Sequence, residues 1–395
     1  MEISSTYTCP GCEVGKMSIF YELNGFPVHT VLNISTKTEA LGYRRGDIRL
    51  AYCPECGFIS NINFDPGLLE YGSNCEEGQG FSPTFRVFAQ GLAHRLVDRY
   101  GLKGKTILEI GCGKGEFLSM LCEYGGNRGI GFDPAYVEGR FAISGEGSVE
   151  FIKDFYSEKY SHYRADFICC QMTLEHIQPV KSFVRKMRRA IGENESTVVF
   201  FQVPDVTRIL RDCAFEDIYY EHCSYFSPGS LARLFQKNGF EVLDLRVEYN
   251  GQYLTIEARP FLESGNVVSP LEQDLTSLQK YVSTFDQRVS NKIASWQKSM
   301  EVFLQGEKEG VIWGSGSKGV AFLINLGLED HVKYVVDINP HRQGMFMPGT
   351  GQEIVAPAAL RRIRPDVVIV MNRVYQKEIQ EELEEMGLTP EIFAL

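Results

Sequence analysis

Side chains that can donate or accept protons stand together in the stretch YYEHCSYFS, residues 219–227. Tyr219, Glu221 and His222 carry a phenol, a carboxyl group and an imidazole, which proteins commonly use for general acid–base catalysis. Such a cluster can remove a proton from a substrate if it lies over one. The same residue types also occur on exposed surface turns, so the elements that position the stretch must decide between the two interpretations.

Four cysteines form a second chemical signal, because they occur in two Cys-x-x-Cys turns, CPGC and CPEC. These turns contain Cys9, Cys12, Cys53 and Cys56. Two such turns can supply four thiolates to one tetrahedral zinc ion. A complete set of four leaves no open coordination position, so the pattern predicts a structural Zn²⁺. The alternative is four unrelated buried thiols.

A glycine-rich turn follows an apolar run in ILEIGCGKGEFL, which contains Glu109, Gly111, Gly113 and Gly115. Asp133 ends the next apolar run, 22 positions after Gly111, where a carboxylate can bind two ribose hydroxyls. Many Rossmann-like domains use such a turn. The pattern therefore predicts a cofactor site but leaves a nicotinamide cofactor as an alternative.

The elements that must position these residues alternate between short apolar runs and helical segments from residue 86 to 260, which is typical of a parallel α/β sheet. A helix is expected over 180–191 and a hairpin around Asn250 and Gly251. The expected strands are 106–112, 128–133, 149–154, 165–170 and 196–203.

Two loops are expected to meet over the cofactor site. QMTLEHI, residues 171–177, follows the fourth strand, and the segment that contains 219–227 follows the fifth. Open α/β sheets bind ligands at the carboxyl ends of their strands. Gln171 and His176 should therefore lie near the acid–base stretch, although His176 also suits a purely hydrogen-bonded scaffold role.

The length of 395 residues predicts more than one domain. Apolar residues recur every three or four positions from 268 to 304, which indicates one long amphipathic helix or two in series. The predicted units are a cysteine-bearing domain over 1–85, an α/β domain over 86–260, a helical linker over 261–305 and a second α/β domain over 306–395.

Charge and hydropathy exclude several classes of function. The 40 basic and 51 acidic residues give a net charge of −11, which disfavours binding to a phosphate backbone. No window approaches eighteen consecutive apolar residues, and the start of the chain lacks a secretory signal. The sequence predicts a cytoplasmic protein without nucleic-acid or membrane partners.

The first glycine turn resembles the class I S-adenosylmethionine-dependent methyltransferases, whose first motif reads ExGxGxG. This resemblance implies a Rossmann-like core that binds S-adenosyl-L-methionine. It also implies that Asp154 and Phe155, after the third strand, hold the adenine and that Gln171 contributes to the cofactor site. The cofactor carries a sulfonium and an amino acid instead of a pyrophosphate, so no phosphate site at a helix terminus is required.

The whole chain resembles the three-domain sugar C-methyltransferases that act on nucleotide-linked 4-keto deoxysugars. That family has a zinc-binding N-terminal domain, a class I methyltransferase core and a Rossmann-like C-terminal domain. The resemblance implies a small-molecule partner, a nucleotide-diphosphate sugar, and a monomer or homodimer. The motifs that carry it are CPGC, CPEC, LEIGCGKGEF, LEHI, YYEHCSYFS and GSGSKG.

The resemblance also implies roles for the acid–base residues. Tyr219, Glu221 and His222 match the catalytic YxEH motif of the family, and His176 matches the histidine of LEHI. Methylation of a carbon beside a ketone requires a base to form the enolate and a donor to stabilise its oxygen. We expect His222 to be the base, with Glu221 setting its tautomer and basicity and Tyr219 donating to the enolate oxygen or sharing the proton relay.

One segment departs from the family pattern. Relatives have an aromatic hydroxyl within a YxxxY-like stretch, whereas this chain has Tyr71 followed by Cys75. We expect Tyr71, Cys75 and Tyr220 to contact the substrate. Because of this departure, an O- or N-methyltransferase of another small metabolite stays an alternative. A nucleic-acid or protein methyltransferase is disfavoured by the acidic charge.

The C-terminal unit contains a second glycine turn, VIWGSGSKGVAF. Gly314, Gly316 and Gly319 have the dinucleotide-binding spacing, and Asp337 ends the next strand, so a NAD-dependent reductase is an alternative. The family resemblance instead implies a cofactor-free domain that helps to hold the nucleotide sugar, with Lys318 beside the diphosphate. A purely structural cap is the third interpretation.

Overall fold

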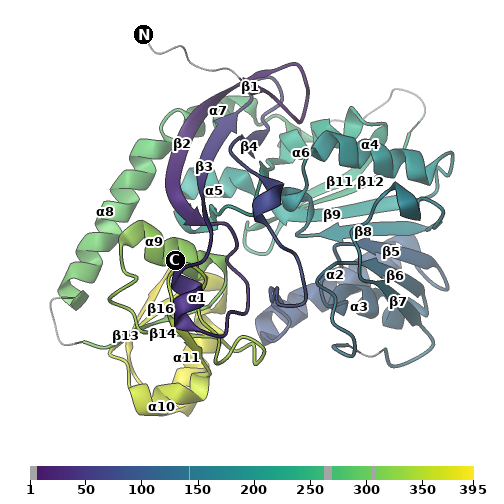
Figure 1. The fold of residues 1–395 in the computed structure, drawn as a ribbon. Helices are drawn as coiled ribbons and strands as arrows, with labels where there is room; N and C mark the ends of the chain where they lie inside the picture. The colour runs from purple at the N-terminus through teal and green to yellow at the C-terminus, as the bar shows by residue number, and fades with distance from the viewer. Residues whose placement is uncertain (1–6, 142, 262–268, 305–307) are drawn as a thin grey trace, which may run out of the picture.

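The computed structural model describes residues 7–141, 143–261, 269–304 and 308–395 (Figure 1). Three β-sheets follow one another along the chain, with helices packed between and around them. Within the described residues, no helix is both long enough and apolar enough to cross a membrane. The parts of the predicted linker at 262–268 and 305 lie outside the described residues.

The central sheet has seven strands in the order β11-β12-β9-β8-β5-β6-β7, and it confirms the predicted α/β core. Within this sheet, the five strands from β5 to β9 are mutually parallel, and β12 runs antiparallel to β9 and β11. Strand order reverses at β5, which creates the crevice where such sheets bind ligands. The strands are β5 (Thr106–Ile110), β6 (Arg128–Phe132), β7 (Ser148–Ile152), β8 (Phe167–Gln171), β9 (Val198–Pro204), β11 (Phe240–Glu248) and β12 (Tyr253–Pro260).

Helices cover both faces of this sheet, because its short apolar strands are buried on each side. The predicted helix over 180–191 is present, and the hairpin turns at Asn250 and Gly251, which both have positive φ. The helices of this part are α2 (Pro83–Tyr100), α3 (Glu116–Gly125), α4 (Val180–Ile191), α5 (Val206–Asp212) and α6 (Pro228–Gln236).

The N-terminal sheet includes a strand from the acid–base stretch. Ser224 and Tyr225 form β10, which pairs antiparallel with Ser60 and Ile59 of β4. Glu221 and His222, just before β10, are only 2% and 4% exposed, so the stretch is not a surface turn. The other elements are β1 (Tyr7–Thr8), β2 (Lys16–Pro27), α1 (Lys37–Leu41), β3 (Arg45–Tyr52) and β4 (Ile59–Asn61).

The C-terminal sheet is entirely parallel, in the order β15-β14-β13-β16-β17. Two helices in series, α7 (Leu275–Val282) and α8 (Phe285–Leu304), precede it. Its strands and helices are β13 (Gly310–Trp313), α9 (Ser317–Leu326), β14 (Tyr334–Val336), β15 (Glu353–Val355), α10 (Leu360–Ile363), β16 (Val367–Val370), α11 (Gln376–Glu385) and β17 (Glu391–Ala394).

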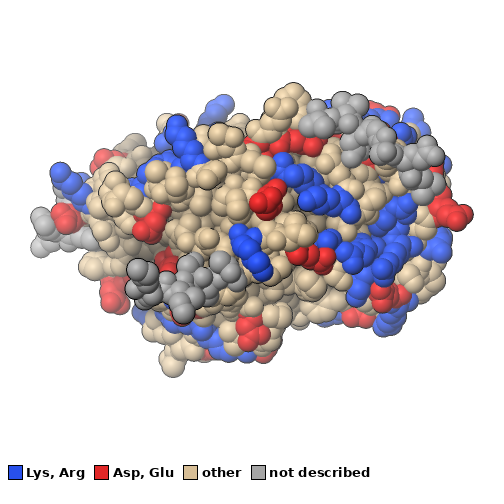
Figure 2. Space-filling model, turned by 90° about the horizontal axis from the view of Figure 1, so that it is seen from above, with Lys and Arg blue, Asp and Glu red and all other residues tan. Residues whose placement is uncertain are grey.

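Charged side chains are mixed on the face seen in Figure 2. Lysine and arginine gather towards one end of this face, with aspartate and glutamate among them, and most of the rest is uncharged. This mixed distribution does not form a continuous basic stripe on that face, in line with the acidic net charge.

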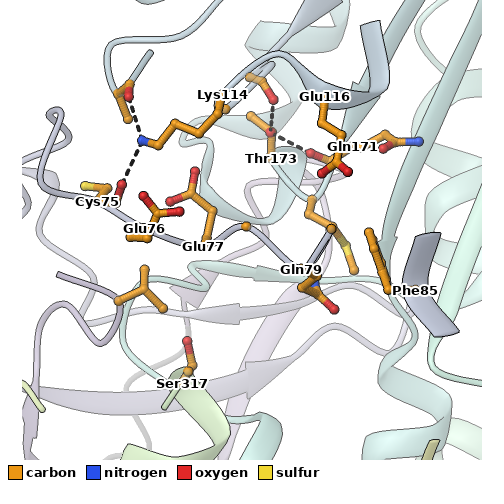
Figure 3. Close-up of a pocket in the computed structure, with 18 of the residues that line it drawn as sticks. Cys75, Glu76, Glu77, Gln79, Phe85, Lys114, Glu116, Gln171, Thr173 and Ser317 are labelled. Carbon is orange, nitrogen blue, oxygen red and sulfur yellow. Dashed lines mark hydrogen bonds between the residues drawn. The ribbon is translucent and has the colours of Figure 1, made fainter. Parts of the chain in front are cut away.

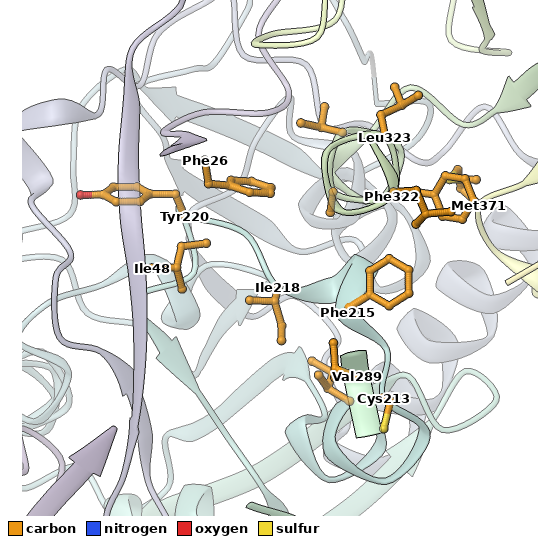
Figure 4. Packing of buried hydrophobic residues seen from close by; sticks show 14 of the residues in the cluster. Phe26, Ile48, Cys213, Phe215, Ile218, Tyr220, Val289, Phe322, Leu323 and Met371 are labelled. Atoms are coloured by element: carbon orange, nitrogen blue, oxygen red, sulfur yellow. The ribbon is translucent and has the colours of Figure 1, made fainter. Parts of the chain in front are cut away.

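One apolar core joins the N-terminal and C-terminal sheets around the loop that follows β9 (Figure 4). Phe215 and Ile218 of this loop are fully buried between Phe26 and Ile48 of the N-terminal sheet and Phe322 of α9. The core therefore fixes the start of the acid–base stretch from both sides.

We expect Phe215→Ala to lower the free energy of unfolding by about 3–5 kcal/mol, because the truncation leaves a cavity in this shared core. Chemical denaturation measures the loss. Val87 is 70% exposed, and Val87→Ala should change the same quantity by less than about 0.5 kcal/mol. Equal effects of the two substitutions would contradict the role of the core.

Candidate active site

A cavity of about 790 Å³ lies where the three parts of the chain meet. Its wall includes Tyr71 and Cys75 from the segment after the N-terminal sheet, the glycine turn after β5, and Ser317 and Lys318 at the start of α9. Figure 3 shows Cys75, Gln171 and Ser317 around this space. The site thus needs all three parts to be assembled.

The first glycine turn forms one wall of the cavity. Gly111 and Gly113 both line it with positive φ, and a Cβ on Gly111 would lie 2.1 Å from Thr173 Oγ1. Asp133 shapes the turn, since its Oδ2 accepts the Gly113 N–H at 2.8 Å and its Oδ1 accepts the Ala135 N–H at 2.7 Å. Only glycine fits at position 111 without moving its neighbour.

Glu109 lines the cavity at the end of β5 and is 2% exposed. Its Oε2 has no hydrogen-bond partner among the described residues, and burial raises the pKa of the carboxyl group to about 8. Gln171 also lines the cavity, and its Nε2 is likewise buried without a described partner. Both side chains therefore retain polar atoms that a ligand can satisfy.

The other residues predicted for the cofactor differ in their placement. Phe155 lines the cavity, but Asp154 does not, because its carboxylate accepts a 2.6 Å hydrogen bond from Tyr160 and pairs with Lys159. Gly115 lies behind the wall at the start of α3, where a Cβ would come within 2.3 Å of Phe151. Of the predicted adenine-binding pair, only Phe155 reaches the cavity.

The four predicted catalytic residues, Tyr219, Glu221, His222 and His176, all line the cavity. The His222 ring lies 4.2 Å from that of Tyr219 and 4.8 Å from that of His176, measured between centroids. The His222 N–H donates to the Tyr219 carbonyl, which closes a turn with Tyr220 and Glu221 at its corners. The turn brings its first and last side chains together.

This turn also explains a difference from the prediction. The carboxylate nearest to the His222 ring belongs to Glu175, whose Oε1 lies 4.0 Å from His222 Nε2, and not to Glu221. Glu221 Oε1 instead accepts the N–H and the hydroxyl of Thr30, both at 2.6 Å, and lies 3.3 Å from His29 Nδ1. As a corner residue, Glu221 is directed away from its neighbour in sequence.

Burial sets the protonation states of these groups. It lowers the pKa of His222 well below the ordinary value and that of His176 to about 4. It also raises the pKa of the Tyr219 phenol well above the ordinary value. At neutral pH both imidazoles can therefore accept a proton, and the phenol can donate one.

The predicted substrate-contacting residues are only partly brought together. Tyr71 lines the cavity with its hydroxyl 3.2 Å from His176 Nδ1, and Cys75 and Lys318 line it too. The Lys318 ammonium donates to Asp217 Oδ2 at 2.8 Å. Tyr220 does not line the cavity, because its hydroxyl accepts the N–H of Asp65 within the N-terminal part.

The loop that begins at Cys75 is fixed to its surroundings by charged side chains. Lys114 of the glycine turn donates to the carbonyl oxygens of Cys75 and Ala135 at 2.7 and 2.6 Å (Figure 3). The Glu76 carboxylate accepts from Arg140, and the buried Arg342 of the C-terminal part donates to the Glu76 carbonyl at 3.2 Å. The loop thus connects the two α/β parts.

In the C-terminal glycine turn, Gly314 and Gly316 line the cavity. Gly319 packs on the turn itself, since a Cβ there would lie 2.6 Å from the Gly314 carbonyl. The Asp337 carboxylate accepts from the N–H and the hydroxyl of Ser315. Asp337 thus shapes its turn as Asp133 shapes the first one, with an additional hydrogen bond from the serine hydroxyl.

The four predicted metal ligands lie together in the N-terminal part. Cys9 Sγ is 3.7 Å from Cys56 Sγ, and Cys12 Sγ is 3.8 Å from Cys53 Sγ. All four sulfurs lie within 4.8 Å of one another. A tetrahedral site with four zinc–sulfur bonds has sulfur–sulfur edges of about 3.8 Å, so the cluster fits a zinc ion.

Sequence reasoning missed His29, Thr30 and Glu175. Glu175 carried an available signal, because it stands beside His176 in the loop expected over the cofactor. His29 and Thr30 carried none, since their contacts with Glu221 join residues about 190 positions apart.

Comparisons with known proteins agree with this architecture. Residues 85–245 match the model of a methyltransferase domain, and residues 269–389 match that of a C-methyltransferase C-terminal domain. The C-methyltransferase NovU of Streptomyces niveus is 23% identical over 305 residues, which cover 73% of this chain and 71% of NovU.

Other similarities are confined to part of the chain. The ubiquinone biosynthesis O-methyltransferase of Escherichia coli O127:H6 is 28% identical over 114 residues, or 28% of this chain and about half (47%) of that enzyme. The magnesium protoporphyrin IX methyltransferase from Synechocystis PCC 6803, solved with bound SAH, is 12% identical with a TM-score of 0.35, covering 45% of this chain and 84% of that one.

The two domain matches follow one another along the chain, and the similarity to NovU covers 73% of it. These matches agree with the seven-stranded sheet and with its glycine turn after β5. The chain is therefore an S-adenosylmethionine-dependent methyltransferase that is similar to a C-methyltransferase, in agreement with the resemblance first seen in its motifs.

Proposed function

We propose that the protein methylates a carbon beside the ketone of a nucleotide-linked 4-keto deoxysugar, through an enolate. The observation that carries this proposal is the group of neutral acid–base side chains, Tyr219, His176 and His222, in the same cavity as the glycine turn. Removal of a proton from carbon needs a base that is uncharged before the reaction, and burial keeps the imidazoles in that state.

In this proposal His222 is the base. Its Nδ1 is buried without a hydrogen-bond partner among the described residues, so it is free to take the proton. The electron pair of the broken C–H bond then forms the enolate, whose oxygen accepts a hydrogen bond from Tyr219. Burial raises the pKa of Glu175, 4.0 Å from the ring, to about 8, so Glu175 stabilises the resulting imidazolium once it has lost its own proton.

The cofactor supplies the electrophilic methyl group. Glu109, Gln171 and Phe155 line the part of the cavity next to the glycine turn, and we assign them to cofactor binding. Asp133 has a double role in this assignment, because it shapes the turn through Gly113 and retains lone pairs for ribose hydroxyls. Asp154 would support this wall from behind.

The start of α9 suits the diphosphate of the proposed substrate. Ser317 and Lys318 line the cavity at the N-terminal end of this helix, where the helix dipole favours an anion. Lys318 adds a positive charge, at present paired with Asp217. The N-terminal zinc domain, the cytoplasmic location and the domain boundaries given above are part of the same proposal.

Cofactor binding should release a proton from Glu109. Its pKa of about 8 means that the free carboxyl group is mostly protonated at pH 7, whereas the cationic cofactor favours the carboxylate. Affinity should therefore rise as the pH increases from 7 towards 8. Calorimetry in buffers of different ionisation enthalpy should find about one proton released, and markedly fewer in Glu109→Gln. Equal release from both proteins would contradict this assignment.

We expect His222→Asn to abolish enolate formation, with a loss of about 10²–10⁴-fold, because asparagine cannot accept the proton. The measurement is deuterium uptake beside the carbonyl of nucleotide-linked 4-keto sugars in heavy water, without cofactor, by mass spectrometry. The same change at the exposed His331 is the control and should leave exchange unchanged. Wild-type exchange in His222→Asn would refute the base assignment.

The cysteine cluster should hold one zinc ion per chain. Cys53→Ser removes one of the four thiolates, so we expect loss of the metal and a lower melting temperature. Elemental analysis of the purified proteins measures the zinc. Cys213→Ser changes a cysteine of the shared apolar core and should retain one zinc ion per chain. A wild-type protein that binds no zinc after growth with zinc would sink the idea.

A further inference from the structure

A second group of reactive side chains lies in the same cavity, away from His222. The Cys75 Sγ atom is 3.5 Å from His29 Nε2, and His29 Nδ1 is 3.3 Å from Glu221 Oε1. Cys75, His29 and Glu221 are 2%, 1% and 2% exposed, and all three line the cavity. A thiol, an imidazole and a carboxylate in series have the order of a nucleophile, a base and the group that orients the base.

Thr30 determines which nitrogen of His29 carries the proton. Its N–H and its hydroxyl both donate to Glu221 Oε1, so this oxygen is an acceptor. His29 Nδ1 lies 3.3 Å from this oxygen without forming a hydrogen bond, and the negative potential of the acceptor favours the tautomer with the proton on Nδ1. In that tautomer Nε2 presents its lone pair to the thiol. The Cys75 S–H group can thus donate to His29, as the first step of a relay requires.

Cys75 differs from the ordinary buried cysteines of this chain. A buried thiol usually behaves as a small apolar side chain, with no acid–base partner. Cys112 also lines the cavity, but among the described residues it has no histidine partner, which makes it a matched internal control. A reagent that enters the cavity can meet both thiols. A difference between their reaction rates that depends on His29 therefore reports activation of Cys75 and not access to the cavity.

We propose that Cys75, His29 and Glu221 form a second proton relay in which the Cys75 thiol is a catalytic group that exchanges a proton with the substrate. His29 takes the S–H proton at Nε2, and the bonding electron pair stays on sulfur as a thiolate. In its ionised form, which a pKa of about 7 makes available at neutral pH, Glu221 stabilises the imidazolium across the 3.3 Å contact with Nδ1. The thiolate regains this proton from His29, or it accepts a proton from the substrate carbon. In the second case the His29 imidazolium passes its proton to water, and the relay then returns to its starting state.

The relay deepens the proposed function. It rests on that function for the identity of the substrate. Tyr71 lies between the two acid–base groups, with its ring edge-on to both His29 and His176. Glu221 contacts both, because its carboxylate faces His29 while its carbonyl oxygen lies 3.0 Å from His176 Nδ1. A ketone substrate between them would meet a base on each side of Tyr71.

The resting relay is uncharged. Burial raises the pKa of Cys75 to about 12 and lowers that of His29 to about 3, so the neutral thiol and imidazole predominate. These pKa values make transfer of the S–H proton to His29 unfavourable in the resting site, so the relay requires the thiolate and the imidazolium to be stabilised as an ion pair by the charges around them. The titratable and charged groups that face the pair are Glu77, Lys114 and Asp133 around Cys75, and His176, Arg342 and Glu221 around His29.

Alkylation of the full-length protein by iodoacetamide tests the relay without any substrate. Peptide mass spectrometry follows Cys75 and Cys112 separately at several pH values. At pH 8 we expect His29→Gln to slow the labelling of Cys75 at least tenfold and to leave that of Cys112 unchanged. The rate at Cys75 in this variant should rise about tenfold per pH unit, as for an unassisted thiol, and less steeply in the wild type.

Two results would overturn the proposal. One is an unlabelled Cys75 in the folded wild type, because a thiol that a small reagent cannot reach from the cavity cannot meet a substrate. The other is the same rate and pH dependence with and without His29. Calorimetric binding of S-adenosylmethionine confirms that the variant is folded. If the His29→Gln variant is not folded, Glu221→Gln is used in its place. We then expect slower labelling of Cys75, and an unchanged rate would refute the relay.

A protection experiment separates this relay from the proposed sugar substrate. Saturating nucleotide-linked 4-keto sugar should slow the labelling of Cys75 in the wild type. If no such sugar protects Cys75 and His29→Gln still slows its labelling, the relay stands and the sugar assignment fails. If the sugar protects Cys75 but His29→Gln labels at the wild-type rate, the sugar assignment stands and the relay fails.

Discussion

The pairing of β10 with β4 is the contact on which the rest of the site depends. It draws the loop after β9 out of the central part and seals it against the N-terminal sheet, while Phe215 and Ile218 pack between that sheet and α9. Glu221 and His222 are therefore buried without being part of the central sheet. Burial, in turn, keeps the imidazoles neutral, so a tertiary contact outside the central sheet helps to set the protonation state of the cavity's histidines.

The same burial leaves polar atoms without partners. Glu109 Oε2, Gln171 Nε2, Glu175 Oε2 and His222 Nδ1 have none among the described residues. Each unsatisfied buried group costs about 1–3 kcal/mol, so a fold would not concentrate them in one place without compensation. A bound ligand supplies that compensation, because it brings donors and acceptors to the atoms that the chain leaves open. These four residues all line the cavity, so their open atoms are candidate contacts for the ligand.

The sequence predicts those features that depend on local spacing. The five central strands, the hairpin at Asn250 and the four-cysteine cluster all follow from periodicity and turn chemistry. The direction of side chains within a loop does not follow from such local patterns. Tyr220 and Glu221 stand at the corners of a turn whose ends are Tyr219 and His222, and no pattern of residue types shows where such a turn begins. The partners of Glu221 were equally hidden, because Thr30 and His29 reach it only after the N-terminal sheet has formed.

The loop after β9 connects the acid–base groups to the C-terminal part as well. Asp217, two residues before Tyr219, accepts hydrogen bonds from Arg208 and from Lys318 of α9. An anion bound at the start of α9 would compete with Asp217 for the Lys318 ammonium, since both are negatively charged. Release of Lys318 leaves Asp217 on Arg208 alone and changes the field at the neighbouring phenol, whose pKa is already raised by the Asp217 charge after burial. The part of the protein proposed to hold the diphosphate therefore acts on the group proposed to hold the enolate through one carboxylate.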